Sequence, residues 1–267
     1  MNFGGKCRFT LSLGPERDSL LTYQRRMNSD EYDNLVRVER HHWFYTGKRT
    51  IARWAIDTFG SKADRPTLFD CGAGTGAFAA EMVSTHHVSV MDDHAESLEL
   101  LRQKFTPDQV IEGSASAMPL PDNTADIVTL LDVLEHVEDD TSAVAEIHRV
   151  LKPGGILVLT VPAMMQLWSS WDEVLHHFRR YHREPLRGMF SSADWQIEHI
   201  KYVNTAVFPL VWWARRSRRP TDSARSEEYI PPGWINACLR WVFVKSAVTR
   251  WWPAPFGVGL LLVVRRK

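Results

Sequence analysis

Short and nearly continuous apolar runs recur through the middle of the chain, and stretches with helical spacing of apolar positions separate them. Such runs are typical of strands that are buried on both faces of a parallel sheet. The pattern predicts strands at 67–70, 88–92, 109–112, 126–131 and 156–162, with helices from about Ala77, at 96–105 and at 141–151. This alternation of strand and helix predicts an α/β fold built on a doubly wound, mostly parallel sheet.

Helical spacing also precedes the first strand. Residues 29–59 are predicted to form two helices, the first capped by Ser29 or Asp30 and the second starting near Thr50. The segment 41–49 between them is rich in aromatic residues and ends in Lys-Arg. Two interpretations of this segment remain open. It folds over a ligand, or its aromatic side chains attach the helical layer to the sheet.

Residues 1–27 show no clean periodicity and carry a net positive charge. We therefore expect a weakly ordered N-terminal extension, and Met27 is an alternative start of the natural chain. The remainder, residues 28–267, is predicted to form a single domain, because its length suits one large α/β domain with elaborations.

A glycine-rich segment, Asp70-Cys71-Gly72-Ala73-Gly74-Thr75-Gly76, joins the first predicted strand to the helix that follows it. Glycines at this spacing let the backbone turn tightly and approach a ligand closely, because no Cβ stands in the way. The helix start then points free N–H groups toward the ligand. Two ligand classes use this geometry, namely dinucleotides and S-adenosylmethionine (SAM).

Asp70 separates these two ligand classes by its charge. A carboxylate beside the turn would repel a pyrophosphate, whereas it can accept a charge-assisted hydrogen bond from the ammonium of SAM. The spacing of Gly72, Gly74 and Ala77 also fits the dinucleotide fingerprint, with Asp92 about twenty residues further on. The dinucleotide alternative therefore stays open, although the charge favours SAM.

Composition indicates the cellular compartment of the protein. The three cysteines, Cys7, Cys71 and Cys238, are scattered and have no metal-ligand spacing, which favours a reducing compartment. The first residues lack the pattern of a signal peptide, and no apolar run reaches the ~20 residues of a membrane span. We expect a cytoplasmic protein, with membrane contact at most peripheral, and no resident metal.

The net charge of zero hides an asymmetry along the chain. Residues 176–267 carry sixteen Lys/Arg and six Asp/Glu, a net charge of +10, and nine of the eleven tryptophans follow residue 167. A basic and Trp-rich C-terminal third indicates an anionic partner or an interfacial surface. Solvated arginines on ordinary helices, with tryptophans in the core, are the alternative.

Six motifs in order along residues 67–162 resemble class I SAM-dependent methyltransferases, and most closely the branch called methyltransferase type 11. The motifs are Asp70–Gly76, Asp92, Pro119-Leu120-Pro121-Asp122, Asp126-Ile127-Val128, Glu135-His136-Val137 and Leu151-Lys152-Pro153-Gly154-Gly155. The resemblance implies SAM as cofactor and S-adenosylhomocysteine as product, but it says almost nothing about the methyl acceptor.

The resemblance also implies the fold, a seven-stranded Rossmann-like methyltransferase sheet that ends in an antiparallel hairpin. The hairpin strands are expected at 196–203 and 259–265. The chain then divides into a helical cap, a SAM-binding core, a lid on the acceptor side and a helical insertion before the last strand, at residues 28–60, 66–162, 163–195 and 204–257, respectively.

The resemblance assigns cofactor contacts residue by residue. Asp70 would meet the methionine amino group, Asp92 or its neighbour Asp93 would hold the ribose hydroxyls, and Asp132 would face the methionine end. Ser114 stands where the family usually has an acid that accepts from the adenine amino group, and the N–H of Ala115 would reach the ring. Gly72, Ala73, Gly74 and Gly76 complete the expected contacts of the loop. Apart from the resemblance, the basic end of the segment 41–49 suggests that Arg49 pairs with the cofactor carboxylate.

The segment 167–182 follows the fifth strand and is dense in His, Arg, Tyr and acidic residues. Methyl transfer needs alignment and a dry pocket, and a general base helps when the acceptor is a hydroxyl. The candidate bases are His176, His177, Tyr181 and, after the fourth strand, His136. The candidate substrate contacts are Trp168, Trp171, Arg179 and Arg180. Alternatively, Asp172 or Glu173 pairs with these arginines on a solvated helix face, and His136 has a positioning role.

The insertion 204–257 has three interpretations: a lid over an apolar acceptor, a homodimer contact, or a surface that rests on a membrane. We expect methylation of a small acceptor that is apolar, phosphorylated or lipid-linked, at oxygen first, then at nitrogen or carbon. The alternatives are a nucleic-acid methyltransferase and a non-catalytic or NAD-type nucleotide-binding protein. Against nucleic acid, the chain lacks an Asn/Asp-Pro-Pro-Tyr/Phe motif and a catalytic Pro-Cys pair.

Overall fold

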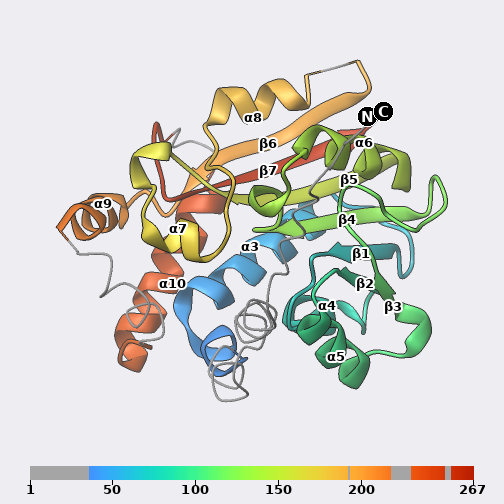
Figure 1. The fold of residues 1–267 in the computed structure, drawn as a ribbon, viewed down its shortest axis with the longest axis horizontal. Helices are drawn as coiled ribbons and strands as arrows, with labels where there is room; N and C mark the ends of the chain where they lie inside the picture. Colours follow the sequence, from blue (N-terminus) through green and yellow to red (C-terminus); the bar gives the residue numbers. More distant parts are fainter. Residues whose placement is uncertain (1–35, 192, 218–229, 250–253) are drawn as a thin grey trace, which may run out of the picture.

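The computed structural model describes residues 36–191, 193–217, 230–249 and 254–267 (Figure 1). The expectations for residues 1–27, for Met27 and for the cap at Ser29 or Asp30 lie outside these residues. The described chain forms a seven-stranded sheet in the order β3-β2-β1-β4-β5-β7-β6. Its strands are β1 (Thr67–Cys71), β2 (His87–Asp92), β3 (Val110–Glu112), β4 (Ala125–Leu131), β5 (Leu151–Pro162), β6 (Trp195–Val203) and β7 (Gly259–Arg266).

Strands β1 to β5 pair in parallel, and β7 lies antiparallel between β5 and β6. The predicted seven-stranded, mostly parallel α/β sheet with a terminal antiparallel hairpin is therefore confirmed. Strand β5 begins at Leu151, five residues before the predicted start, because Ala125 of β4 pairs with it there.

Two hydrophobic clusters make up the core, and the sheet contributes side chains to both. One cluster includes residues of α3 (Trp43–Phe59), α4 (Ala77–Met82) and α10 (Gly233–Val248). The other includes residues of α6 (Asp140–Val150) and α8 (Arg183–Met189). The remaining helical elements are α5 (Ala95–Lys104), α7 (Ser170–Val174), α9 (Phe208–Ser217) and the 3-10 turns Pro107–Gln109, Leu134–His136 and Met165–Leu167.

Helix α3 corrects the prediction for the aromatic segment. The helix begins at Trp43 rather than near Thr50, because contacts from a distant helix hold its first turns. The N–H of Trp43 donates to Oδ1 of Asn236 at 2.7 Å, and the ring of Phe44 stacks on Phe243 of α10. A Cβ on Gly47 would come within 2.5 Å of the same phenylalanine ring, so glycine permits this close approach.

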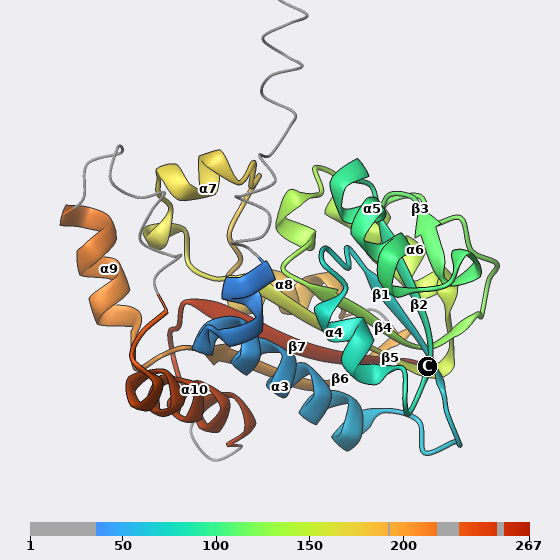
Figure 2. The ribbon, with the colours of Figure 1, turned by 90° about the horizontal axis from the view of Figure 1, so that it is seen from below.

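The predicted insertion contains α9 and α10, which lie at the end of the molecule away from β3 (Figures 1 and 2). Helix α10 runs beside α3, and α9 contacts the Met165–Leu167 turn. None of the helices in the described residues combines the length and the apolar character that a membrane span requires.

Candidate active site

The glycine-rich loop leaves β1 at the carboxyl edge of the sheet and is attached to β2 through the N–H of Gly72, which donates to Met91 at 2.8 Å. Gly72, Gly74 and Gly76 all have positive φ, at 69°, 55° and 73°. A Cβ would collide with Val133 at Gly72 and with Leu101 at Gly76, whereas at Gly74 it would meet nothing within 4 Å. Gly74 therefore borders open space in which a ligand can approach the backbone.

Asp70, at the end of β1, is only 3% exposed and accepts a hydrogen bond from Oγ1 of Thr129 at 2.6 Å. Burial raises its pKa to about 7, with smaller contributions from the charges of Asp92 and Glu39. Such a carboxylate lacks a cationic partner among the described residues. It suits a ligand that brings an ammonium group, and it does not suit a pyrophosphate.

The second acid of the site is Asp92, at the end of β2. It is buried, and its carboxylate accepts from the N–H groups of Gly74 at 2.9 Å and His94 at 3.0 Å. Asp93 instead has a side chain that is 60% exposed and pairs with Nδ1 of His94 at 2.7 Å. The hydrogen bond to Asp92 raises the pKa of His94 to about 9. The structure thus places Asp92 against the glycine loop and directs Asp93 to solvent, contrary to the prediction for Asp93.

The segment after β3 lies beside Asp92, whose carbonyl accepts from Gly113 at 3.1 Å. Oγ of Ser114 lies 3.1 Å from Oγ of Ser116, and Ala115 is buried. Their adenine contacts stay predictions.

Other groups of the chain hold Arg49, and its contact with the cofactor carboxylate stays a prediction. Its guanidinium pairs with Glu81 at 2.7 Å and donates to the carbonyl of Glu39 at 2.8 Å. The neighbouring Lys48 instead forms an ion pair with Asp132, which follows β4 as predicted. Lys48 also lies over the ring of Phe44, 4.5 Å from its centroid.

Asp132 sits on strained backbone with φ at 58° and accepts from Oγ1 of Thr160 at 2.7 Å. Burial alone would raise the pKa of Asp132, but the ammonium of Lys48 and the hydroxyl of Thr160 hold it below its ordinary value. The site therefore contains one carboxylate kept ionised by a cation, Asp132, and one that is easily protonated, Asp70.

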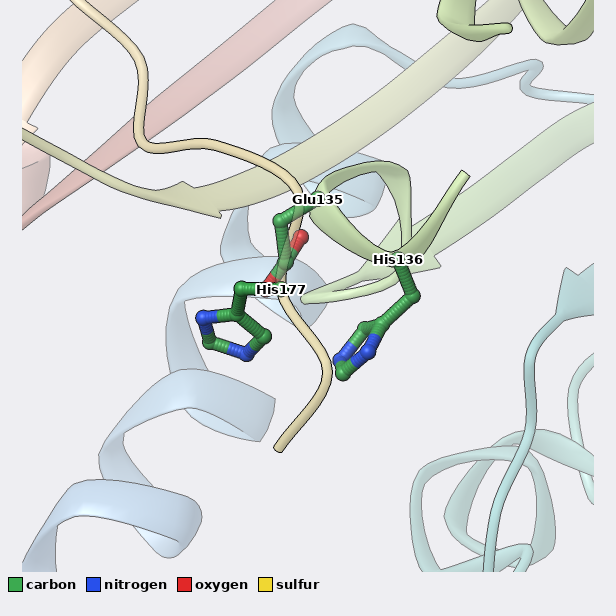
Figure 3. Close-up of side chains that lie close together, drawn as sticks. All are labelled: Glu135, His136 and His177. Atoms are coloured by element: carbon green, nitrogen blue, oxygen red, sulfur yellow. The ribbon is translucent and has the colours of Figure 1, made fainter. Parts of the chain in front are cut away.

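Glu135, His136 and His177 meet next to Asp132, and Figure 3 shows the two imidazoles side by side with the carboxylate of Glu135 close to them. The imidazole centroids are 4.6 Å apart, in edge-to-face contact. Burial, followed by the charge of His177, lowers the pKa of His136 to about 4, so this ring is neutral at pH 7. Glu135 is 1% exposed, and burial followed by the charge of Asp132 raises its pKa well above the ordinary value.

Comparison with known proteins identifies the class. Residues 69–159 match a family model described as a methyltransferase domain. The chain is 29% identical to a demethylmenaquinone methyltransferase of Lactiplantibacillus plantarum over 216 residues, which are 66% of this chain and 86% of that protein. Residues 69–159 thus form a methyltransferase domain, and these findings support a class I SAM-dependent methyltransferase.

Two further comparisons agree with this class. A ubiquinone/menaquinone biosynthesis C-methyltransferase of Escherichia coli is 31% identical over 142 residues, which cover 48% of this chain and 56% of that protein. The structure of a geranyl diphosphate methyltransferase in complex with SAM aligns with a TM-score of 0.55 over 82% of this chain and 85% of that one, at 18% identity. These findings support a SAM-dependent methyltransferase.

The acceptor-side segment of the methyltransferase is organised by Asp172, which is fully buried. Its carboxylate accepts from Arg180 at 2.7 Å, from Arg215 at 3.0 Å and from Nδ1 of His177 at 3.0 Å. Although burial opposes ionisation, these donors hold the pKa of Asp172 far below its ordinary value. Arg180 is 6% exposed and its guanidinium is held by this ion pair, so its contact with a substrate stays a prediction that the structure does not favour. Asp172 therefore pairs with an arginine as in the alternative interpretation, but the pair is buried rather than on a solvated helix face.

Tyr181 is also withdrawn from the candidate bases. Its hydroxyl is buried, donates to the carbonyl of Leu134 at 3.3 Å and lies 3.0 Å from Oδ2 of Asp140, and burial moves its pKa far above the ordinary value. Arg179 pairs with the same Asp140 at 2.7 Å, away from a role as a free substrate clamp. Tyr181 thus holds the Leu134–His136 turn through the carbonyl of Leu134.

The other acceptor-side candidates are more open. His176 is exposed, with φ at 55°, whereas the side chain of His177 is 8% exposed, so His177 is the stronger candidate base of the two. The indole N–H of Trp168 donates to Glu173 at 3.5 Å, and Trp171 is half-buried. Their contacts with an acceptor stay predictions.

Sequence reasoning missed Lys48 and Glu135 as components of the site. The sequence analysis assigned the basic contact to Arg49 and not to Lys48. Neighbouring residues of a helix point in different directions, so in the helix 43–59 only one of the two can face the site. Glu135 was read only as part of a motif. The available signal was an acid three positions after a strand-end carboxylate and next to a histidine.

Proposed function

We propose that this methyltransferase transfers its methyl group to a hydroxyl oxygen of a small acceptor. The observation that supports this proposal is the pair of imidazoles, His136 and His177, beside Asp132 at the carboxyl edge of the sheet. Open α/β sheets bind their ligands at this edge. A hydroxyl must lose its proton to become a strong nucleophile, and the imidazole pair is the group that can manage that proton.

The arrangement around His177 supports this role. Its Nδ1 lies 3.0 Å from Asp172, which orients the ring and leaves the other nitrogen directed away from that carboxylate. The side chain of His177 is 8% exposed, so bulk water has little access to its ring. When bound, SAM supplies the electrophilic methyl group, and Asp70, Asp92 and the glycine loop would hold it.

Carbon methylation of a hydroxylated ring is the second candidate function. Two relatives are named as methyltransferases of demethylmenaquinone and of ubiquinone/menaquinone biosynthesis. Loss of a ring hydroxyl proton would activate the neighbouring carbon, so the same imidazoles would serve either reaction. Nitrogen as acceptor has no comparable observation in its favour.

We also propose that the outer face of α10 contacts a lipid surface. Trp234 and Trp241 are 76% and 62% exposed and lie seven residues apart, which places them on one face of the helix. Arg240 and Lys245 are exposed nearby. Exposed indoles with basic side chains are typical of helices that lie in a membrane interface. This surface would bring the enzyme to a lipid-linked acceptor.

Vesicle sedimentation tests the lipid proposal. The wild type should cosediment with vesicles of mixed neutral and anionic lipid, and Trp234→Ala/Trp241→Ala should lose most of that binding. A control, Trp54→Phe on α3, should bind as the wild type does. Equal binding by all three proteins would refute the proposal, and loss of a dimer in sedimentation velocity would favour the homodimer alternative instead.

The acceptor is tested by incubating the enzyme with methyl-labelled SAM and a panel of catechols, hydroquinones, prenyl phosphates and amines. Mass spectrometry with fragmentation then assigns the labelled atom. The proposal expects O-methyl products and at least a tenfold lower kcat, about 1.4 kcal/mol in activation free energy, for His177→Ala. Labelled amines only, or an unchanged kcat in that variant, would refute it.

A further inference from the structure

Glu135, His136 and His177 place one carboxylate oxygen and two imidazole nitrogens within 4.8 Å of one another. We propose that these three side chains bind a divalent transition-metal cation and that the acceptor hydroxyl becomes a further ligand of this cation. This inference rests on the proposed function and names the device that removes the acceptor proton. It departs from the expectation of a protein without a metal.

The carboxylate of Glu135 points to a missing cation. The side chain is 1% exposed, and its Oε2 has no hydrogen-bond partner among the described residues. The two neighbouring carboxylates are compensated, since the partly buried Asp132 pairs with Lys48 and the buried Asp172 with Arg180. A buried acceptor oxygen without a donor is costly and rare in folded proteins. A metal ion would satisfy it.

The two histidines are oriented as metal ligands usually are. Nδ1 of His177 lies 3.0 Å from the carboxylate of Asp172, and the ring of His136 is hydrogen-bonded to the backbone carbonyl of Leu175. Each imidazole therefore has an outer acceptor for one nitrogen, and the proposed cation would bind the other. An outer acceptor of this kind fixes the tautomer and strengthens the ligand nitrogen.

Figure 3 shows how the fold assembles the cluster from two segments. Glu135 and His136 come from the 3-10 turn after β4, and His177 comes from the segment after α7. The N–H of Phe178 donates to the carbonyl of Glu135 at 2.8 Å, so the backbone itself ties the two segments together. A hydrogen bond between backbone groups therefore fixes the positions of the two segments that carry the cluster.

The donor set selects the kind of cation. Two imidazole nitrogens and one carboxylate oxygen suit Zn²⁺, Fe²⁺ or Mn²⁺, whereas Mg²⁺ and Ca²⁺ prefer oxygen ligands. Three protein ligands leave coordination positions open, as in catalytic metal sites. A hydroxyl that binds there has a lowered pKa and is held in place for attack.

The step is a displacement that needs no redox partner. The acceptor oxygen gives up its proton to bulk water as it binds the cation. One of its electron pairs then forms the bond to the methyl carbon, while the electrons of the broken carbon–sulfur bond stay on sulfur. The products are the methyl ether and S-adenosylhomocysteine, and the cation keeps its charge throughout.

Metal binding is tested without an acceptor. The full chain, freed of metal by a chelator that is then removed, is titrated with ZnCl₂ by calorimetry, and metal content is checked by mass spectrometry. One Zn²⁺ should bind per chain. Glu135→Gln, which preserves the shape of the side chain, and His136→Ala should each weaken binding at least tenfold. The exposed residues Glu99 and His87 provide matched controls, Glu99→Gln and His87→Ala, which should bind as the wild type does.

A second group of potential ligands, Asp92, Asp93 and His94, is largely exposed and provides the competing site. If His94→Ala abolishes zinc uptake while Glu135→Gln does not, the assignment is overturned, as it is if the wild type binds no zinc. Retained SAM binding by each variant shows that it is folded. Zinc bound at Glu135 without methylation of any hydroxyl would instead refute the proposed function and leave the metal site standing.

Discussion

The burial of Asp70 leads to a direct prediction about stability, because an ionised carboxylate that is buried destabilises the folded chain. Raising its pKa from 3.8 to about 7 corresponds to about 4 kcal/mol, at about 1.4 kcal/mol for each tenfold change. The folded chain binds this proton more tightly than the unfolded chain does. The contribution of protonated Asp70 to the free energy of unfolding is therefore complete below pH 3.8, and it is lost as the pH rises through 7.

The substitution Asp70→Asn removes this titration and keeps an oxygen that can accept from Thr129. Between pH 5 and pH 8, the free energy of unfolding of the wild type should fall by about 3 kcal/mol relative to that of the variant. For a chain of this size, the melting temperature of the variant should gain roughly 6–10 °C over that of the wild type across this interval.

Urea denaturation of both proteins at pH 5 and pH 8 measures the difference, with Asp64→Asn on the surface as a control. The same variant should lose SAM affinity, and in the wild type that affinity should rise about thirtyfold from pH 5.5 to pH 8, as the ionised fraction of Asp70 does. A stability difference that does not change with pH would refute the reasoning about burial. Unchanged SAM affinity in the variant would refute the role of Asp70.

Other predictions follow from the same site. Lys48→Met leaves the carboxylate of Asp132 without its cation and should lower the free energy of unfolding by about 3 kcal/mol, measured in urea, while Lys62→Met on the surface should not. Gly74→Ala forces a methyl group into the open space of the loop at positive φ, with a cost of about 1–2 kcal/mol, and should weaken SAM binding roughly tenfold or more by calorimetry. Gly76→Ala should mainly lower stability, because its methyl group meets packed side chains; a larger loss of stability in the first glycine variant would contradict this division.

Much of the sheet was predictable, because strands such as β4 and β5 are buried on both faces and appear as apolar runs between glycine-containing turns. Asp70 and Asp92 were predictable for the same reason, since each ends such a run. The start of α3 was not predictable from local pattern. Its first turns are stabilised by Asn236 and Phe243, which are nearly 200 residues away in the chain.

The acceptor side shows the limit of local reasoning more clearly. The sequence places Arg179, Arg180 and Tyr181 in a promising segment, but only the fold shows that Asp172 and Asp140 occupy them. The cluster of Glu135 with His177 is likewise tertiary, because its members are forty-two positions apart. A pattern of residue types cannot reveal which of several cations meets which carboxylate.

The account depends most on the assignment of the loop between Asp70 and Asp92 to SAM. Isothermal titration of the full chain with SAM, S-adenosylhomocysteine and NAD tests this assignment directly. We predict one bound SAM per chain, comparable binding of S-adenosylhomocysteine and no heat from NAD. Binding of NAD without binding of SAM would contradict the account.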